Sequence, residues 1–312
     1  MKSKTSLEAF TSFAEAYSPF PWECNETSHQ DDIRGKHGVL ISLVRYWQVV
    51  GCLESIAANT PLSSVMDIGS YPGSFIKIIR KFLGNDVEYA GIGLGFSDEY
   101  KSEMHKLGGK LFETELDPDF IQAKLVRDWP FSGIDCCMFL DVIEHLVNPV
   151  DCLDRINKAL RMGGKLIITT DNITALGCIV PMLRRGESPN IHPLRSQLFY
   201  RGDWRPHFKE FSRAELIFFL EYCGFRLIEH RYFEREQGDY YFDGKGRVRR
   251  RSRYRGLKGL IRKMLFRYIP HLRDHQILIA EKIFEFSDQA LIRPTPTSDL
   301  NEWSRLRESF GL

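Results

Sequence analysis

The segment SVMDIGSYPGSF, residues 64–75, combines residue types that suit the binding of a small ligand. A short apolar run contains Asp67, and two glycines, Gly69 and Gly73, follow it four residues apart. Glycine adopts backbone angles that other residues avoid, so Gly69 permits a sharp turn and Gly73 permits a helix to begin close to whatever lies above it. A strand, a turn and a helix in this order place backbone N–H groups at the turn.

The same segment does not match the two common phosphate-binding patterns. A dinucleotide-binding turn requires a glycine at the position that Tyr71 holds here, and a P-loop requires a lysine after its last glycine. Considered alone, the segment therefore predicts either a site for another kind of ligand or a turn with a purely structural role.

Acidic and histidine side chains form a second candidate group. Asp141, Glu144 and His145 follow an apolar run, and His207 stands in the segment RPHFKEFS. Because histidine changes charge near neutral pH, His145 and His207 are candidates for proton transfer, although an orienting or structural role is the more common one for such residues. The first three residues could together bind a divalent ion, but Glu144 as a cap of the next helix is the simpler interpretation, and we expect no metal.

A repeating pattern of apolar runs and helical segments begins near residue 62 and must position these residues. The runs expected to form strands are 63–68, 87–94, 110–116, 134–141, 165–170, 226–234 and 275–284. The helical segments are 74–83, 97–107, 150–162 and 212–225, and the glycines at 163 and 164 are expected to end the third. This alternation predicts an α/β fold, a Rossmann-like, seven-stranded, mostly parallel doubly wound sheet with helices on both faces and an N-terminal helical cap over residues 1–60.

The composition indicates a protein with a large core and no membrane span. The chain has 312 residues, of which 43% are hydrophobic. No apolar run approaches the roughly 20 residues that a membrane helix needs. The seven cysteines include no C-x-x-C pair, which favours buried thiols in a reducing compartment over a zinc cluster. We therefore expect a soluble, cytoplasmic protein.

Three further segments, taken with the glycine turn, resemble a known family. They are IDCCMFLDVIEHLVNP, ALRMGGKLIITTDN and RPHFKEFSRAELIFFLEYCGF. Together and in this order, over roughly residues 62–283, they resemble the class I S-adenosylmethionine-dependent methyltransferases, in particular the broad small-molecule and ubiquinone-type group. The resemblance implies an enzyme whose cofactor is S-adenosyl-L-methionine.

The resemblance also implies a set of cofactor-binding residues and a place for the first histidine. The methionine and ribose side of the cofactor would be lined by Asp67, Gly69, Ser70 and Gly73. Gly93 and Leu94 would lie by the ribose, and Glu115 and Leu116 by the adenine. The methionine moiety would be flanked by Leu140, Asp141 and Val142. His145 would face the reaction space, and His145 and His207 would be the catalytic candidates.

One departure from the family pattern concerns the ribose. Members usually carry an acid at the end of the second strand, where it accepts hydrogen bonds from both ribose hydroxyls, but this chain has Gly93 and Gly95 there. Asp98 lies one helical turn later and is the acid that we expect to replace it. The alternative is a weakened affinity for the cofactor.

A basic segment, residues 244–273, separates the last two expected strands and contains no acid. An amphipathic helix is predicted, because apolar residues recur at helical spacing, namely Leu257, Leu260, Ile261, Met264 and Leu265. Its other face would carry Lys258, Arg262 and Lys263. Three uses compete: docking on the protein's own sheet, contact with an anionic membrane surface or a diphosphate-linked lipid or sugar, and nucleic-acid binding. The third is the weakest, because no RNA-binding module accompanies the arginines.

The expected function is O-methylation of a small molecule, a glycan or a lipid-linked precursor. An RNA methyltransferase and a non-catalytic scaffold are the alternatives, suggested by the arginines and by the missing ribose acid. The expected domains are a cap over 1–60, a methyltransferase domain over 61–285 and a tail over 286–312. Within the domain, 172–210 would form an insertion on the substrate side and 244–273 a second, basic insertion that could contact a membrane peripherally.

Overall fold

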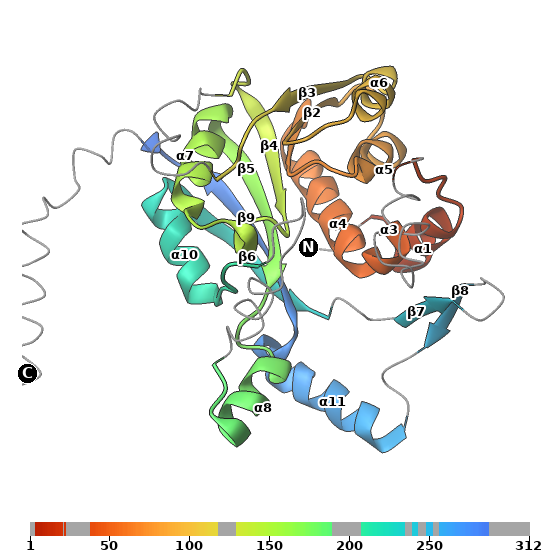
Figure 1. Cartoon of the computed structure of the whole chain (residues 1–312), viewed down its shortest axis with the longest axis vertical. Coiled ribbons are helices and arrows are strands. Elements are labelled where there is room, and N and C mark those ends of the chain that lie inside the picture. Colours follow the sequence, from red (N-terminus) through yellow and green to blue (C-terminus); the bar gives the residue numbers. More distant parts are fainter. Residues whose placement is uncertain are drawn as a thin grey trace, which may run out of the picture.

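The structure is a computed structural model, and it describes residues 4–20, 22, 38–117, 129–188, 207–234, 239–242, 248–251 and 256–286. Seven strands form one sheet in the order β3-β2-β1-β4-β5-β9-β6 (Figure 1). They are β1 (Ser64–Ile68), β2 (Glu88–Gly93), β3 (Gly109–Glu113), β4 (Ile134–Leu140), β5 (Leu160–Asp171), β6 (Phe225–Phe233) and β9 (His275–Lys282). The first five are parallel, and β9 lies antiparallel between β5 and β6. The predicted fold class is confirmed.

Helices cover both faces of this sheet (Figure 1). One face carries α1 (Leu7–Glu15), α3 (Gly38–Ile41), α4 (Leu43–Asn59), α5 (Ser74–Phe82) and α6 (Asp98–Lys106). The other carries α7 (Pro149–Ala159) and α10 (Arg213–Tyr222). The first three helices account for the N-terminal helices that the sequence predicts, as far as residues 4–59 are described.

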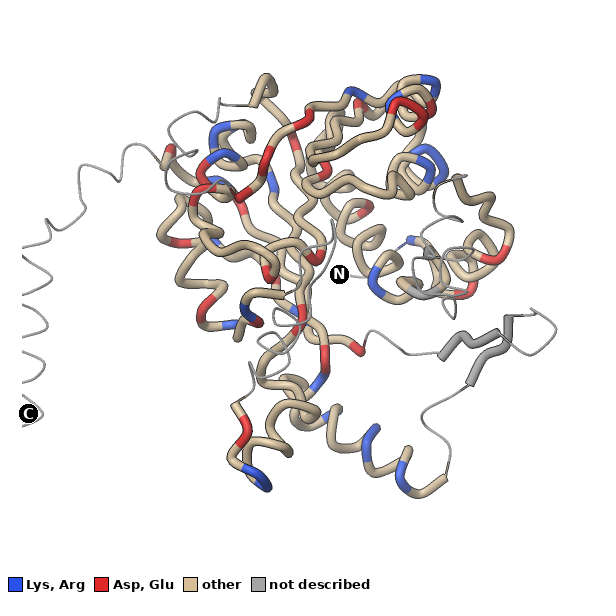
Figure 2. The backbone as a smooth tube through the Cα atoms, viewed as in Figure 1, with Lys and Arg blue, Asp and Glu red and all other residues tan. Residues whose placement is uncertain are grey.

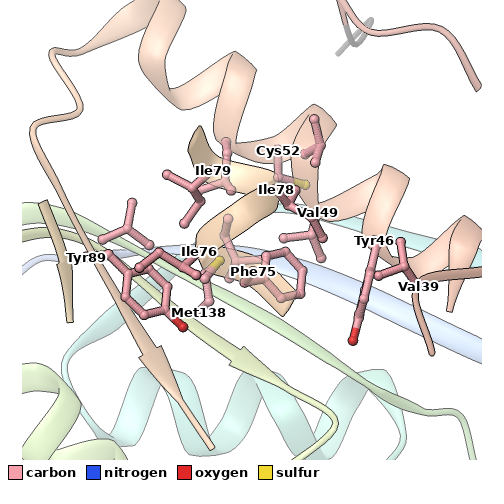
Figure 3. Packing of buried hydrophobic residues seen from close by; sticks show 14 of the residues in the cluster. Val39, Tyr46, Val49, Cys52, Phe75, Ile76, Ile78, Ile79, Tyr89 and Met138 are labelled. Atoms are coloured by element: carbon pink, nitrogen blue, oxygen red, sulfur yellow. The ribbon is translucent and has the colours of Figure 1, made fainter. Parts of the chain in front are cut away.

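The strands separate two apolar cores because successive side chains point to opposite faces. Along β4, Cys136 and Met138 enter the core under α4 and α5, whereas Cys137 and Phe139 enter the core under α7 and α10. Figure 3 shows the first core, in which Ile76 and Ile79 of α5 pack between α4 and the sheet. Burial on both faces explains why the strands of the sheet centre are continuously apolar.

Several predicted boundaries are wrong. Gly163 and Gly164, expected to end a helix, lie inside β5, and β5 begins at Leu160 instead of residue 165. The helix expected over 150–162 ends at Ala159, because Leu160 already pairs with Ile134 of β4 and Arg161 forms an ion pair with Asp135 at 2.6 Å. The third strand ends at Glu113 instead of residue 116. The carbonyls of the next residues bind the Arg155 guanidinium of α7 and therefore leave the strand ladder.

The remaining elements extend from the carboxyl-terminal side of the sheet (Figure 1). They are α8 (Leu176–Arg185), the hairpin of β7 (Asp239–Phe242) and β8 (Val248–Arg251), α11 (Gly256–Tyr268) and the 3-10 turn η4 (Pro270–Leu272). The helix predicted inside the basic segment is confirmed as α11, whereas the hairpin was not predicted. The tail at 287–312 and residues 189–206 of the expected insertion lie outside the described residues. In the ranges that the structure describes, no helix is long and apolar enough to cross a membrane.

Candidate active site

The turn after β1 is held against the two neighbouring strands. The N–H groups of Gly69 and Ser70 donate to the Ile92 carbonyl of β2 at 2.8 and 3.0 Å. Gly69 has a φ of 73°, and a Cβ built on it would lie 2.7 Å from a methyl group of Val142, just beyond β4. Only glycine fits this position, because any side chain would be strained and would push the turn away from β4.

The two polar side chains of this turn are buried beneath it. The Asp67 carboxylate is 4% exposed and accepts a hydrogen bond from the Tyr89 hydroxyl at 2.7 Å. Burial raises the pKa of Asp67 to about 7, although the Tyr89 hydrogen bond and the charge of Arg45 act against this shift. The Ser70 hydroxyl lies 3.2 Å from that of Tyr100. Both residues thus stabilise the shape of the turn that the resemblance assigns to the cofactor.

The end of β2 lacks the usual acid but has another close by. Glu113, the last residue of β3, accepts hydrogen bonds from the N–H groups of Gly95 and Phe96 at 2.9 and 3.2 Å. Its other carboxylate oxygen pairs with Lys101 at 2.9 Å. The Lys101 hydrogen bond is the main cause of a lowered pKa of Glu113. The carboxylate therefore organises the turn, and the prediction from sequence missed it.

The other predicted residues at this edge differ in exposure. Leu94 is 61% exposed at the end of β2, and the Phe96 ring fills the space beside Gly93, where a Cβ would lie 2.7 Å from it. Asp98 is the exposed first residue of α6, directly after the N-cap Ser97. Gly73, with a φ of 91°, is the N-cap of α5.

Glu115 and Leu116 form the adenine side of the predicted site. Both lie in the segment after β3, and Arg155 holds this segment through their carbonyls at 2.9 and 2.6 Å. The Asp117 carboxylate then accepts from the N–H groups of Val147 and Asn148 at 2.8 and 3.0 Å. The structure thus connects the end of β3 to the loop after β4.

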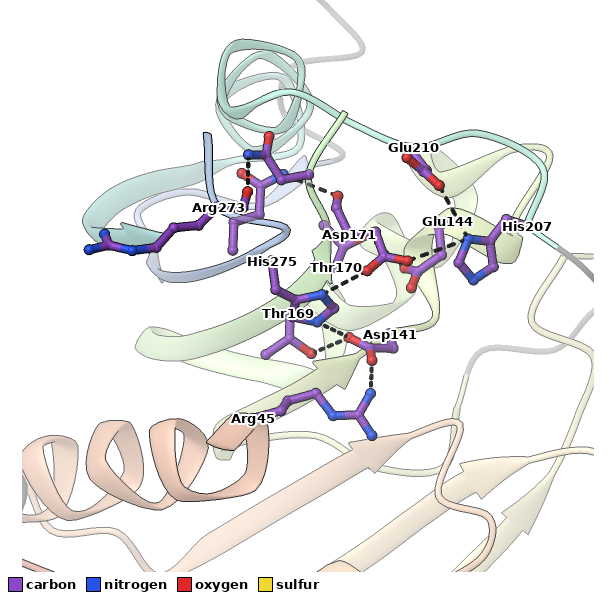
Figure 4. Close-up of polar contacts among 12 residues, drawn as sticks. Arg45, Asp141, Glu144, Thr169, Thr170, Asp171, His207, Glu210, Arg273 and His275 are labelled. Atoms are coloured by element: carbon purple, nitrogen blue, oxygen red, sulfur yellow. Dashed lines mark hydrogen bonds and ion pairs between the residues drawn. The ribbon is translucent and has the colours of Figure 1, made fainter. Parts of the chain in front are cut away.

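A polar network occupies the carboxyl ends of β4 and β5 (Figure 4). Asp141 follows Leu140 with a φ of 52° and accepts a hydrogen bond from the Thr169 hydroxyl at 2.8 Å. The fully buried His275 ring lies between two carboxylates, with Nε2 2.9 Å from Asp141 and Nδ1 2.8 Å from Asp171. Arg45 of α4 forms an ion pair with Asp141. Carboxylates only accept, so these contacts require two protons on His275, or one on its ring and one on a carboxyl group.

His207 lies at the solvent side of this network. Its Nδ1 is 3.7 Å from Asp171 and 3.9 Å from Glu210, and its side chain is 24% exposed. The His145 ring meets it edge to face, with 4.7 Å between the ring centroids. Burial disfavours the charged ring, but the surrounding carboxylates, Glu210 foremost, raise the pKa of His207 above its ordinary value. The structure thus brings together the two histidines that the sequence singles out.

Glu144 has a different role from the helix cap that we expected. Its side chain is buried and accepts from the Thr170 hydroxyl at 2.8 Å, while its backbone carbonyl accepts from the N–H groups of Phe208 and Lys209. Burial, followed by the charge of Asp171, raises the pKa of Glu144. The residue therefore fixes the segment that carries His207 against the sheet.

Two sets of side chains in the described part of the chain have donor atoms suited to a divalent cation. Glu144, His145 and His207 form one set, and Asp171, His207 and Glu210 form the other. Within each set all donor atoms lie within 4.8 Å of one another. Histidine nitrogens mixed with carboxylate oxygens suit a transition-metal ion better than Mg²⁺, which prefers oxygen ligands.

Sequence reasoning missed four residues of the network: Arg45, Asp171, Glu210 and His275. Asp171 and Glu210 stand inside the segments that resemble the family, so their positions in those segments could have identified them as candidate site residues. His275 opens a predicted strand that reads as purely structural, and its place beside Asp141 follows from the β5–β9 pairing, in which Asp171 is opposite His275.

A methyltransferase domain family model matches residues 49–230, which is more than half of the chain. The chain belongs to this methyltransferase domain family. Its members use S-adenosylmethionine, so the protein is an S-adenosylmethionine-dependent methyltransferase. A comparison with curated proteins finds no match.

Three solved structures illustrate what the chain is similar to. One is a Haloferax volcanii complex of the Trm112 methyltransferase activator with a methyltransferase, at 14% identity and a TM-score of 0.49, covering 86% of this chain and 100% of that one. An S-adenosylmethionine-dependent methyltransferase from Archaeoglobus fulgidus has 15% identity and a TM-score of 0.46, with 84% and 100% covered. Another S-adenosylmethionine-dependent methyltransferase, from Aquifex aeolicus, has 12% identity and a TM-score of 0.44, covering 89% of this chain and 100% of that one.

The residues at the carboxyl edge of β1, β2 and β4 fit this cofactor. Gly69 gives the first turn a backbone-only surface, Gly95 has open space where a Cβ would be, and Leu94 leaves an apolar side chain exposed beside them. When bound, S-adenosylmethionine supplies a methyl group on a positively charged sulfur.

Proposed function

We propose that this methyltransferase methylates an oxygen of its acceptor and that His207 takes the proton from that oxygen. The observation that carries the proposal is the position of His207, partly exposed at the carboxyl edge of the sheet and surrounded by carboxylates. Methyl transfer is an in-line displacement, so the protein has to align the acceptor and accept one proton. In this step the acceptor oxygen forms the bond to the methyl carbon, the carbon–sulfur bond breaks, and the proton moves to the His207 ring.

The neighbours of His207 support this role. The Asp171 and Glu210 carboxylates lie near its Nδ1 and stabilise the positive ring that forms when the proton arrives. His145 meets the ring edge to face and limits its rotation. We propose a small molecule, a glycan or a lipid-linked precursor as the acceptor class, since each offers a hydroxyl group.

The proposal is tested with radiolabelled cofactor and fractionated small-molecule, glycan and lipid extracts. In the fraction that accepts label, His207→Ala is expected to lower turnover by about 100-fold or more and to leave cofactor affinity unchanged. His105→Ala, on the exposed face of α6, is the matched control and is expected to have normal turnover. Normal turnover in a folded His207→Ala variant would exclude the role. Bound S-adenosylhomocysteine in the purified protein, detected by mass spectrometry, tests the cofactor site independently.

A second arrangement of the same reaction is favoured by the donor set of Glu144, His145 and His207. A divalent cation held there would lower the pKa of a bound hydroxyl group. His207 would then be a ligand and not a base. Titration calorimetry with Mn²⁺ and Mg²⁺, and turnover before and after treatment with a chelator, separate the two arrangements: no cation binding and unchanged turnover retain His207 as the base.

A further inference from the structure

Helix α11 is oriented with its apolar stripe away from the body of the protein. Its inner side is anchored by Phe266, which is buried, and by Arg262, whose guanidinium donates to the Glu234 carboxylate at 2.9 Å. The opposite side exposes five large apolar side chains, Leu257 at 73%, Leu260 at 55%, Ile261 at 57%, Met264 at 54% and Tyr268 at 75%. At about 100° per residue these five share one face, roughly opposite Phe266.

This orientation reverses the usual arrangement of a surface helix. A helix of a globular protein normally packs its apolar stripe on the core and turns its charged face to water. Here the body of the protein leaves the apolar stripe uncovered. The first of the three predicted uses, docking of this stripe on the protein's own sheet, is therefore wrong. Apolar surface gathered in this way marks a site of interaction.

Helix α8 enlarges the exposed apolar surface. Val180, Met182 and Leu183 are 38%, 40% and 76% exposed, and none of the ten residues of α8 is buried. The start of α8 and the end of α11 are joined. Asn172 and Thr174, just before α8, both donate to the carbonyl of His271 in η4, which follows α11. Figure 1 shows both helices projecting at the same end of the molecule.

The charges on these two helices have a single sign. Neither α8 nor α11 contains an acid. On α11, Lys263 and Arg267 lie along one border of the apolar stripe and Lys258 lies along the other, and all three are exposed. Arg184 and Arg185 end α8, and Arg185 is paired with the Glu187 carboxylate, just beyond the helix, at 2.7 Å. Figure 2 shows the basic positions on both helices. Cations that border an apolar stripe are typical of helices that lie in a membrane interface, where long side chains reach the headgroups.

We propose that α8 and α11 together form a surface that binds an anionic lipid bilayer. The apolar side chains would enter the boundary between headgroups and acyl chains, and the cations would contact lipid phosphates. A bilayer fits better than a second copy of this chain, because two copies joined through these stripes would bring their cations together. Nucleic acid would satisfy the cations but leave Leu260, Ile261 and Met264 uncovered. The proposal goes beyond the proposed function and does not depend on it.

The test is co-sedimentation of the full chain with vesicles. We expect binding to vesicles of equal parts phosphatidylcholine and phosphatidylglycerol, and little binding to phosphatidylcholine alone. Leu257→Ser combined with Ile261→Ser is expected to weaken binding by at least about tenfold, since two apolar side chains no longer enter the interface. The matched control is Phe218→Ser, which removes a side chain that is 66% exposed on α10 and should leave binding unchanged.

The cations are tested separately. Lys263→Gln and Arg267→Gln are each expected to weaken binding roughly fivefold at low salt, with smaller losses at high salt. A gain of signal complements these losses: with Leu260→Trp, added vesicles should shift the fluorescence to the blue, whereas with Phe218→Trp they should not.

Three results would overturn the proposal. The first is the absence of vesicle binding by the folded wild-type chain. The second is a dimer, measured by light scattering, that the Leu257→Ser and Ile261→Ser pair dissociates while vesicles do not bind. The third is retention on an RNA oligonucleotide without retention on vesicles. Cofactor binding, measured by calorimetry on the same preparations, should be normal in every variant and reports separately on the methyltransferase site.

Discussion

At the scale of single residues, Gly69 is the position at which the sequence and the structure agree most directly. Its left-handed backbone and its 2.7 Å approach to Val142 both require glycine. We expect Gly69→Ala to weaken S-adenosylmethionine binding by at least about tenfold, because the turn must move away from β4. Gly84→Ala is the control: Gly84 also has a positive φ, of 106°, but has nothing within 4 Å of a built Cβ.

The two glycine variants separate strain from binding. Both are expected to lose about 1–2 kcal/mol of stability from the left-handed backbone. Only Gly69→Ala should also lose affinity, as measured by calorimetry. Equal cofactor affinities in the two folded variants would mean that the turn does not hold the cofactor.

The ribose contact is a second prediction at this scale. Asp98 is exposed at the start of α6, while Glu113 is already occupied by backbone N–H groups and Lys101. Asp98→Ala is therefore expected to weaken cofactor binding by about 1–3 kcal/mol, the cost of losing a charged acceptor. Glu99→Ala, in the same turn, controls for the loss of charge. If the two variants bind alike, the ribose is held by other groups.

Asp67 gives a prediction about pH. Its pKa is about 7 in the folded protein, against 3.8 for an aspartate in water, so between these values the folded state holds a proton that the unfolded state lacks. The contribution of Asp67 to stability is thus greatest at low pH and is lost as the pH rises towards 7, by up to about 1.4 kcal/mol per pH unit. Asp67→Asn keeps an acceptor for the Tyr89 hydroxyl. We expect the free energy of unfolding of this variant, measured in urea relative to wild type, to be higher at pH 7 than at pH 4. The same stability difference between the variant and wild type at both pH values would contradict the raised pKa of Asp67.

At the scale of elements, the anchoring of α11 depends on a pair of charges with unequal burial. Glu234 is 3% exposed, whereas Arg262 is about one-third exposed. Removing the arginine leaves a buried carboxylate without its cation, and we expect Arg262→Ala to cost about 2–4 kcal/mol in urea unfolding. Lys263→Ala, on the exposed side, should change stability by less than about 0.5 kcal/mol. Adding Glu234→Gln should restore much of the loss.

The same scale shows what could be predicted from the sequence. The parallel strands and α5, α6 and α10 follow local patterns of apolar spacing, and Ser97 and Ser212 mark helix starts in the ordinary way. The end of α7 could not be predicted, because the competing interaction comes from Ile134 in another strand. The direction of the α11 stripe could not be predicted either. Amphipathic spacing shows that a helix has an apolar face, but only the anchors at Phe266 and Arg262 show that this face is turned outward.

For the site, the predictable part was likewise the local part. The glycine turn and both histidines stand in recognisable segments. His275 lies 134 residues from Asp141, and no local pattern reveals that β9 inserts antiparallel between β5 and β6 and carries its first residue to the end of β4.

At the scale of the whole molecule, the network at the carboxyl edge connects the N-terminal helices α1, α3 and α4, called the cap below, with the central sheet. Arg45 of α4 pairs with Asp141, which in turn contacts His275 of β9. Both members of the ion pair are nearly buried, with side chains 11% and 13% exposed. A second contact comes from Trp22, whose indole donates to the Pro72 carbonyl of the glycine turn at 2.8 Å.

This connection predicts that the cap and the site are energetically coupled. Arg45→Gln alone leaves the Asp141 carboxylate without its cation in a buried place and is expected to cost about 3 kcal/mol, as is typical when one partner of a buried pair is removed. Asp141→Asn alone should also destabilise. The double variant should be more stable than the sum of the two losses by about 1–3 kcal/mol, because it leaves no buried charge unpaired. The four proteins are compared by urea unfolding at one pH.

The comparison is then repeated with saturating S-adenosylhomocysteine, which should stabilise the wild type more than Arg45→Gln if the pair helps to shape the cofactor site. Strict additivity in both series would show that the cap merely covers the sheet.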